Sequence, residues 1–300
     1  MSVEALVREL CAELDEGGLH GSFLVRDLDT GEELGIEPDL EFPLASLIKV
    51  PLAAATLDRI ARGELDGAKR LEVEPGRVTT PGPTGITRFR HPAAIAVDDL
   101  LYLSMAISDG AATDALFGLT PPAEVARWLR SAGVHGITVR HLMSDLLETP
   151  AERLDPDDLH LAYALAIEAR TAGRGHRLPQ LDVSRANSGS ARAMVDLLEA
   201  LWRPTAVAGK VAARVRELMG ANVLRHRLAP DFASDAARWS SKTGTLLNLR
   251  HEAGVVEHAD GRTFAVAALT ASRVAAMVQP GAEALMGRVA RALRDRLREL

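Results

Sequence analysis

The sequence predicts an α+β fold in which one antiparallel β-sheet is built from both chain termini, flanked by helices, with an all-helical domain inserted between them. Three observations predict this fold. A helix and a strand hairpin open the chain, three strand-like segments and a helix close it, and the pattern between them is helical. Two terminal groups of strands separated by helices imply a single sheet that both ends of the chain complete.

The N-terminal elements follow from periodicity and turn residues. An amphipathic helix runs from the N-terminus to Gly17 and Gly18, which end it. Residues 22–28 and 32–36 have the character of strands, and the turn 29–31 joins them. We therefore predict a helix and a hairpin that lead directly to the segment around Ser46.

The middle of the chain has the period of helices. Apolar residues recur at intervals of three and four, and loops rich in Gly and Pro separate the helical segments. The interval 141–185 is expected to be an enlarged segment with a helix of its own near residues 156–170. The other predicted helices cover residues 50–59, 97–107, 123–132, 191–202 and 210–219.

The period changes again near the C-terminus. Strands are predicted at 238–241, 247–256 and 263–270, and a final helix from about residue 280 to the end. The resulting domain prediction has a discontinuous sheet domain, residues 1–48 and 206–300, and an inserted helical domain, residues 49–205. The functional site is expected at their interface.

Composition excludes several classes of partner. The hydrophobic share of 47% and the charged share of 25% are ordinary for a globular protein. The net charge of −6 offers no basic field for a phosphate backbone, so we expect no nucleic acid partner. No apolar run is long enough to cross a bilayer, and the acidic N-terminal segment is unlike a signal peptide. We therefore expect a cytoplasmic protein with no membrane partner.

Lysine is rare in this chain, and its positions are informative. Only four lysines occur, at 49, 69, 210 and 242, whereas the other basic residues are all arginine. Arginine keeps its proton at any accessible pH, but a lysine loses it readily once the amine is desolvated or placed near another cation. Lys49 follows Ser46 by three residues at the start of an apolar helix, so both lie on one helical face. Either Lys49 moves protons, or its stem is buried while its ammonium reaches water.

Three short motifs occur in order along the chain. Ser-x-x-Lys occupies 46–49, Ser-Asp-Gly occupies 108–110 at the expected end of a helix, and Lys-Thr-Gly occupies 242–244 on the first returning strand. This chain resembles the class A β-lactamases and penicillin-binding proteins, whose signatures are Ser-x-x-Lys, Ser-Asp-Asn and Lys-Thr-Gly in that order. The resemblance extends over nearly the whole chain, and it implies the two-domain fold predicted above.

The resemblance implies catalytic roles for Ser46, Lys49, Ser108 and Lys242. A serine hydroxyl is a poor nucleophile until a neighbouring group takes its proton. Lys49 can take that proton if Lys242 and the helix N-terminus hold it in a positive field that lowers its pKa. Ser108 would then relay a proton to the leaving group.

The resemblance also implies a set of substrate-binding residues. Lys242 and Thr243 would hold a substrate carboxylate or carbonyl. The backbone N–H groups of Ser46 and Thr245 would form an oxyanion hole, in which the loss of one donor typically costs about 3–4 kcal/mol. The expected binding residues are Gly110, Thr243, Gly244 and Thr245.

Two departures from the family pattern bear on activity. Gly110 replaces the asparagine whose amide would hold the acyl side chain of a β-lactam and help to position Lys49. The Glu-x-x-x-Asn loop that activates the deacylating water in class A enzymes is missing, because none of the three asparagines has a glutamate four residues before it. Glu148 and Glu152 lie where a substitute base could sit.

Several functions remain open at this point. The main prediction is a serine hydrolase that forms an acyl-Ser46 intermediate from an ester, amide or lactam and resolves it with water. The alternatives are a transacylase that passes the acyl group to an amine in natural-product biosynthesis, a true class A β-lactamase, and a non-catalytic binding module. The expected partners are a small-molecule acyl donor and, for a transacylase, an amine acceptor. Neither a metal nor a cofactor is expected, since the histidines show no metal-binding spacing.

Overall fold

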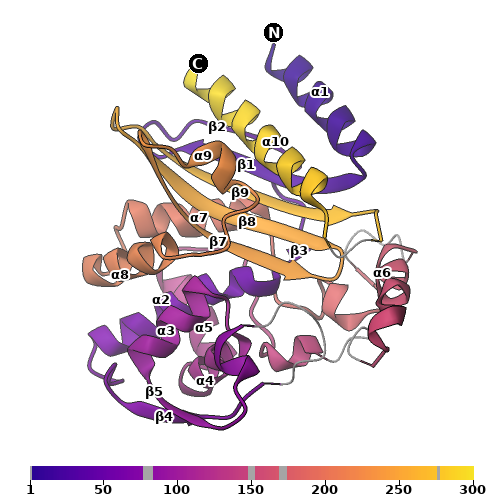
Figure 1. The fold of residues 1–300 in the computed structure, drawn as a ribbon. Helices are drawn as coiled ribbons and strands as arrows, with labels where there is room; N and C mark the ends of the chain where they lie inside the picture. The colour runs from indigo at the N-terminus through magenta and orange to yellow at the C-terminus, as the bar shows by residue number, and fades with distance from the viewer. Residues whose placement is uncertain (1, 77–83, 148–152, 169–173, 276–277) are drawn as a thin grey trace.

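The predicted α+β class is confirmed by the structure, a computed structural model that describes the chain except residues 1, 77–83, 148–152, 169–173 and 276–277. The main sheet has five strands in the order β2-β1-β9-β8-β7, and all neighbours are antiparallel. Both chain termini therefore contribute to one sheet (Figure 1). Its strands are β1 (Leu19–Asp27), β2 (Glu33–Ile36), β7 (Ala237–Leu246), β8 (Leu249–His258) and β9 (Thr263–Ser272).

Helices cover both faces of this sheet. On one face lie α1 (Val3–Glu16), α10 (Pro280–Arg298) and the short α9 (Ala229–Phe232), and α7 (Ala191–Trp202) packs on the other face. Side chains of β1 alternate between the two cores, because Phe23 and Val25 join the core under α1 and α10 and Leu24 joins the other. Residues 264–269 of β9 are all buried, as expected for a strand covered on both faces.

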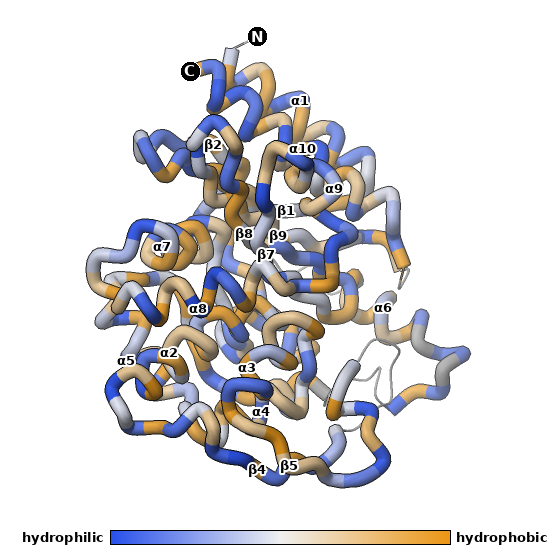
Figure 2. The backbone as a smooth tube through the Cα atoms, turned by 60° about the vertical axis from the view of Figure 1, so that its left-hand side comes forward, coloured by the Kyte–Doolittle hydropathy of each residue, from blue (hydrophilic) through white to orange (hydrophobic). Residues whose placement is uncertain are grey.

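The amphipathic sequence patterns explain which helix faces are buried. In α1, Leu6, Leu10 and Leu14 recur every four residues and face the sheet. The tube in Figure 2 shows hydrophilic and hydrophobic residues alternating along α1 and α10, as expected for helices with one face toward solvent. Gly17 caps α1 by donating its backbone N–H to Glu13 O at 2.9 Å, in agreement with the predicted end of this helix.

Most of the remaining helices lie below the sheet in Figure 1, while α6 (Leu159–Glu168) lies to the right, and α2 (Lys49–Ala61) packs against several of them. Their core is continuous with the core beneath the sheet. The exact domain boundaries at residues 48 and 206 stay a prediction. The helices of this region, apart from short 3₁₀ turns, are α2 (Lys49–Ala61), α3 (Val97–Ala106), α4 (Gly110–Leu119), α5 (Pro122–Ser131), α6 (Leu159–Glu168) and α8 (Gly209–Gly220).

Short strands interrupt the interval that the sequence predicts to be wholly helical. β4 (Arg70–Val73) pairs with β5 (Ala93–Ala96), and β6 (Ser188–Gly189) pairs with β3 (Phe42–Pro43). The prediction missed them because segments of two to four residues are too short to show a period of two. The β3–β6 pair has a consequence for the site, since β3 lies immediately before the turn that carries Ser46.

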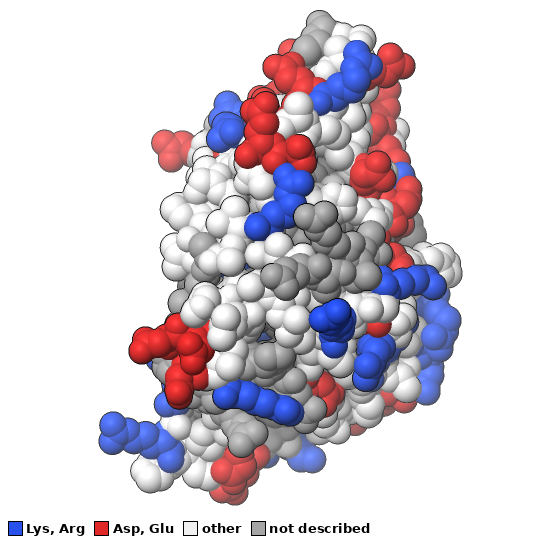
Figure 3. All heavy atoms as spheres, turned by 90° about the vertical axis from the view of Figure 1, so that its right-hand side faces the viewer, with Lys and Arg blue, Asp and Glu red and all other residues white. Residues whose placement is uncertain are grey.

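Charges of both signs occur on the surface. Figure 3 shows Lys or Arg and Asp or Glu side chains interspersed on the face that lies to the right in Figure 1, with acidic groups frequent near the end formed by α1 and α10. None of the described helices combines the length and the apolar character that a bilayer crossing requires.

Candidate active site

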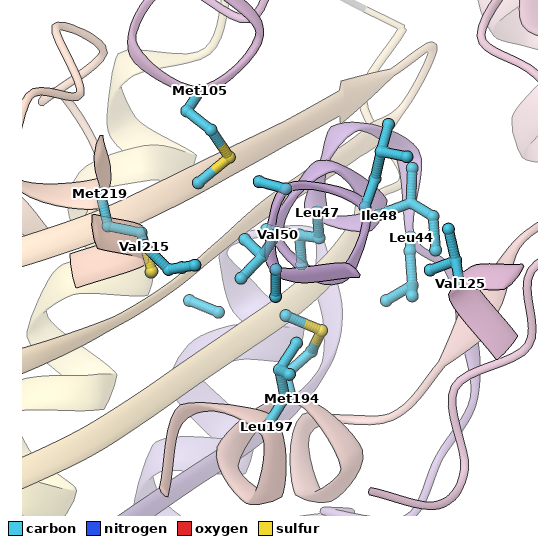
Figure 4. Packing of buried hydrophobic residues seen from close by; sticks show 14 of the residues in the cluster. Leu44, Leu47, Ile48, Val50, Met105, Val125, Met194, Leu197, Val215 and Met219 are labelled. Carbon is cyan, nitrogen blue, oxygen red and sulfur yellow. The ribbon is translucent and has the colours of Figure 1, made fainter. Parts of the chain in front are cut away.

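Ser46 lies on a buried 3₁₀ turn, η1 (Ala45–Ile48), that leads directly into α2. The sequence predicts that Ser46 opens the α-helix, whereas the helix begins only at Lys49. Ala45 has a φ of 47°, a left-handed conformation that is costly for a residue with a side chain and is found most often at functional sites. Figure 4 shows the flanking apolar side chains extending into the core, so the turn is held on several sides: Leu44, Leu47, Ile48 and Val50.

Two contacts fix the chain just before this turn. Leu44 N donates to Asn187 O at 2.8 Å. The buried ring of His251 lies 2.9 Å from Pro43 O through Nε2, while Thr270 N donates to its Nδ1. Burial lowers the pKa of His251 to about 3, so the neutral ring donates to Pro43 O. These contacts hold the chain in place immediately before the turn, and Ser46 itself is partly exposed.

Lys49 is only 1% exposed, which rules out the alternative in which its ammonium reaches water. Its Nζ donates to Ser108 O at 2.6 Å, to Ser108 Oγ at 3.2 Å and to Asp109 O at 3.4 Å. Among the hydrogen bonds of the described residues, none joins Lys49 Nζ to Ser46 Oγ. The amine is therefore oriented toward the Ser-Asp-Gly motif in this state, one turn along the helix from Ser46.

Lys242 reaches the same hydroxyl from β7. Its Nζ donates to Ser108 Oγ at 3.0 Å and to Thr243 O at 3.0 Å, and its side chain is fully buried. Ser108 Oγ therefore lies between two amines that come from opposite ends of the chain. Because a hydroxyl has two acceptor lone pairs and one O–H, an oxygen that accepts twice keeps its own hydrogen free to donate elsewhere.

Burial lowers the pKa of both lysines. The pKa of Lys49 falls from 10.5 to about 7, and the carboxylates of Asp109 and Asp114 oppose this change. The pKa of Lys242 falls well below 10.5 through burial, with further lowering from Lys49 and Arg227. The sequence predicted the direction for Lys49 but attributed it to a positive field, whereas desolvation is the main cause. Near neutral pH, Lys49 is divided between ammonium and free amine.

The Ser-Asp-Gly motif does not end a helix, as the sequence predicted, but joins α3 to α4. Ser108 has a φ of 61°, which breaks the helical path after Ala106. Asp109 is the N-cap of α4, where its side chain accepts from Ala111 N and Ala112 N. The same carboxylate accepts from Ile86 N at 2.5 Å and from Thr87 Oγ1 at 2.6 Å. The Asp109 carboxylate therefore links the loop at 85–87 to the N-terminus of α4.

Gly110 leaves space at the position where the family carries asparagine. A Cβ built on Gly110 would find its nearest described neighbour, Thr87 Oγ1, at 3.8 Å, which is an ordinary contact. Gly110 follows Ser108 by two residues and begins α4. Glycine is thus not required at this position by any contact of the described residues.

Gly244, in contrast, allows β7 to approach the Ser46 turn closely. A Cβ there would lie 2.9 Å from Leu44 O and 3.3 Å from Leu47 Cγ. β7 is the edge strand of the sheet, and η1 packs beside it. Thr243 is buried and Thr245 is exposed. The structure thus places the predicted residues of β7 beside Ser46, while their binding roles and the oxyanion hole stay predictions.

Arg227 belongs to this neighbourhood, and the sequence analysis missed it. Its buried guanidinium donates through Nη1 to Gly244 O and His251 O, both at 2.8 Å, and through Nη2 to Thr245 Oγ1 at 2.6 Å. Its Nε pairs with Glu283 Oε1 at 3.1 Å. No sequence signal distinguishes Arg227 from the many other arginines, because its role depends on contacts between distant elements.

The candidate deacylation bases Glu148 and Glu152 lie outside the described residues. Across the ranges that the structure does describe, no group of three or more His, Cys, Asp or Glu side chains is arranged to hold a metal ion.

Comparisons with known proteins bear on the family and the fold of the chain. The model of a family described as the beta-lactamase enzyme family matches residues 4–297. A protein of Streptomyces cacaoi named beta-lactamase regulatory protein BlaB is 67% identical over 310 residues, which cover 100% of this chain and 99% of that protein. The beta-lactamase SME-1 of Serratia marcescens is 29% identical over 123 residues, 40% of this chain and 41% of its own.

Solved structures of the same fold cover almost all of the chain. A beta-lactamase from Sphaerobacter thermophilus matches with a TM-score of 0.76 and 20% identity over 99% of this chain and 98% of that one. PBP-A matches with a TM-score of 0.76 and 18% identity over 99% and 97%. A mutant of PBP-A, with the same score, identity and coverage, is an acyl-enzyme complex with penicillin G. At these identities the likeness is one of fold.

Proposed function

The chain belongs to the beta-lactamase enzyme family, and on that premise we propose that it is an acyl-transfer enzyme that forms an acyl-Ser46 intermediate from an ester, amide or lactam. One observation carries the proposal: two buried lysines converge on the hydroxyl of Ser108, and one of them, Lys49, follows Ser46 by one helical turn. Burying two amines is costly for a fold, and titratable groups with strongly shifted pKa values are typical of functional sites.

The residues divide the chemistry as follows. The free-amine form of Lys49 takes the proton of Ser46 as Oγ attacks the acyl carbonyl. Ser108, which accepts hydrogen bonds from both lysines, donates its own hydrogen to the leaving group and is reprotonated through Lys49 or Lys242. The bond from the carbonyl carbon to the leaving group breaks as the Ser46 ester forms. Hydrogen bonds between catalytic groups often tighten only when substrate is bound, so Lys49 need not contact Ser46 beforehand.

Water is the proposed acceptor of the acyl group, and an amine is the alternative. Among the described residues, no carboxylate oxygen hydrogen-bonds to Ser46 or to Lys49 Nζ, and the sequence lacks the Glu-x-x-x-Asn loop that activates the deacylating water in class A enzymes. We therefore propose that water attacks the acyl-enzyme slowly. Slow attack by water favours transfer to an amine. It also argues against turnover at the rate of a dedicated class A β-lactamase.

We further propose that the protein acts in the cytoplasm, as the sequence analysis predicts.

A second candidate function is a regulatory protein that responds to an acylating compound. The name of the Streptomyces cacaoi relative, beta-lactamase regulatory protein BlaB, favours it. A long-lived acyl-enzyme is suited to this role, since the covalent adduct reports that the compound is present. Binding without acylation would make no use of the paired lysines, so we regard a purely non-covalent binding module as less well supported.

Intact-protein mass spectrometry tests these functions. The protein is incubated with a panel of activated esters and β-lactams, with and without added amines, and compared with Ser46→Ala. An adduct on the wild type alone, followed by release of the acid, supports a hydrolase. Faster loss of the adduct with amine, and an amide product, supports a transacylase. A stable adduct supports a regulator, whereas equal labelling of Ser46→Ala contradicts the proposed nucleophile.

A further inference from the structure

Glu252 is a fully buried carboxylate that the proposed mechanism does not use. It lies on β8 opposite Thr243 of β7 and is 0% exposed. Its Oε1 accepts from Ser241 Oγ at 2.6 Å and from Trp239 Nε1 at 2.9 Å, and its Oε2 accepts from Leu228 N at 2.7 Å. All three donors are neutral groups. Because an apolar side chain could fill such a space at lower cost, the carboxylate needs a reason beyond stability.

One of these hydrogen bonds leads from Glu252 to the residue beside Lys242. Successive side chains of a strand point to opposite faces of the sheet. Ser241 therefore points to Glu252 on the face that α9 and α10 cover, whereas Lys242 points to Ser108 on the other face. A displacement of the backbone at Ser241 would move the Lys242 amine relative to the Ser108 hydroxyl.

A second path leads from the Ser241 hydroxyl to the segment that carries Ser108. Asn222, which is 2% exposed, donates through Nδ2 to Ser241 Oγ at 3.3 Å. The next residue, Val223, donates its backbone N–H to Ala106 O at 3.0 Å, two residues before Ser108. The same hydroxyl thus connects to the segments that carry both partners of the lysine–serine hydrogen bond described above.

The remaining contact of Glu252 holds the residue that follows Arg227. Leu228 N donates to the carboxylate, and the Arg227 guanidinium donates to Gly244 O farther along β7. Glu252 therefore fixes the backbone from which this buried side chain reaches the strand. As a result, β7 is held on both sides of Lys242.

We propose that Glu252 is a positioning residue of this site, which holds Lys242 at hydrogen-bonding distance from Ser108 through the hydroxyl of Ser241. The inference rests on the proposed function insofar as the contact between Lys242 and Ser108 serves proton transfer. Glu252 acts from the opposite face of the sheet and through its hydrogen bonds. Cutting the link at Ser241 should therefore have the same effect as changing Glu252 itself.

Three variants distinguish this role from a contribution to stability. Ser241→Ala keeps the carboxylate and removes the link, while Glu252→Gln keeps the volume and replaces one acceptor oxygen by an amide donor. Trp239→Phe is the matched control, because it removes another hydrogen bond to the same carboxylate oxygen and leaves the bond from Ser241 in place. For each variant, the stability is measured by denaturant unfolding and the maximal acylation rate with a saturating activated ester.

We expect Ser241→Ala and Glu252→Gln each to lower the maximal acylation rate by about 10–10²-fold, with little change in the ester concentration that gives half of that rate. The double variant should be no slower than the slower single variant, because both changes cut the same link. Trp239→Phe should be less stable but acylated at the wild-type rate. Additive losses in the double variant, or an equal loss in folded Trp239→Phe, would show a general loosening of the fold and overturn the inference.

The scarcity of lysine allows the position of Lys242 to be observed without any acyl donor. Lysine labelled with ¹³C at Cε gives one signal for each of four residues, and Lys242→Arg assigns the signal of Lys242. This signal should move in Ser241→Ala and Glu252→Gln and stay in place in Trp239→Phe.

Two outcomes separate this inference from the proposed function. An unmoved Lys242 signal in folded Ser241→Ala and Glu252→Gln overturns the inference, whatever the activity. A moved signal in a protein that no acyl donor labels supports the positioning of Lys242 and contradicts the proposed function. If Glu252→Gln does not fold, Ser241→Ala, which removes a single hydroxyl, decides.

Discussion

Lys49 shows at the scale of one residue why lysine and arginine are not interchangeable here. Its amine is buried, and burial brings its pKa to about 7. Arginine at this position would remain charged at every accessible pH. Under the proposed function, proton transfer within this buried network would explain why lysine rather than arginine occupies positions 49 and 242.

We expect Lys49→Arg to be nearly as inactive in acylation as Lys49→Ala. Both variants lose the group that accepts the Ser46 proton, and removal of a general base typically costs about 10²–10⁴ in rate. The measurement is the rate of adduct formation with an activated ester. Lys210→Arg, at an exposed lysine, is the control and should keep the wild-type rate. Retention of most activity by Lys49→Arg would show that Lys49 contributes only its charge.

Lys49 should also make stability depend on pH. Because its pKa is lowered from 10.5 to about 7 on folding, the unfolded chain binds more protons than the folded chain between these values. Stability from this group therefore rises with pH through that window, and its cost is fully present below pH 7.

Lys49→Met, which removes the charge at similar volume, should be more stable than the wild type by about 1–4 kcal/mol at pH 6. The advantage should shrink by pH 9, because the wild type then holds Lys49 as the free amine. Denaturant unfolding at both pH values measures it. Equal stability of the two proteins at pH 6, or a gain that grows with pH, would contradict the assigned direction of the pKa change.

The contact between the edge strand β7 and the Ser46 turn is the decisive one at the scale of elements. It is close only because Gly244 lacks a Cβ, which would lie 2.9 Å from the backbone oxygen of Leu44. Backbone at this distance cannot give way as a flexible side chain can. The glycine thus allows the strand that carries Lys242 to pack closely against the turn that carries Ser46.

Gly244→Ala should therefore separate the two elements. We expect a loss of about 1–3 kcal/mol in stability and a decrease of about 10²-fold in the acylation rate, since small displacements of reacting groups are costly. Gly118→Ala is the control: nothing lies within 4 Å of its Cβ on α4, and it should be stable and active. Wild-type acylation by Gly244→Ala would show that this contact does not position the site.

At the scale of the whole molecule, the site combines side chains from three separate parts of the chain. Ser46 and Lys49 follow the N-terminal hairpin, Ser108 joins two helices of the inserted region, and Lys242 comes with the returning strands. The family pattern adds two further groups to such a site. One is the asparagine that Gly110 replaces, and the other is the Glu-x-x-x-Asn loop that this sequence lacks.

Penicillins should accordingly acylate the protein slowly and leave a persistent adduct. We expect kcat/KM far below the roughly 10⁶ M⁻¹s⁻¹ of an efficient enzyme, because Gly110 offers no amide and no Glu-x-x-x-Asn loop activates water. Gly110→Asn should speed formation of the adduct without speeding its loss, since a side chain fits there. Gly110→Ala, which fills the space without an amide, is the control. Rapid penicillin turnover by the wild type would point back to Glu148 or Glu152 as the base.

The sequence by itself determined the α+β class, the sheet shared by both termini and the three motifs, because these follow from local periodicity and short spacings. Through their resemblance to a known family, the motifs also predicted one site made of Ser46, Lys49, Ser108 and Lys242. The structure brings Lys49 and Lys242 together at Ser108 Oγ, and the catalytic roles stay predictions. It misjudged the Ser-Asp-Gly segment, where the capping preference of Asp109 starts a new helix.

Only the tertiary structure decided what surrounds the motifs. The burial of Lys49 and Lys242, and hence the main cause of their lowered pKa values, arises from packing between elements distant in sequence. The contacts of Arg227 with β7 and of Asp114 with Met143 and Ser144 likewise join segments whose pairing no local pattern encodes. Desolvation and electrostatic fields depend on the whole set of neighbours in space, and a sequence lists neighbours only along the chain.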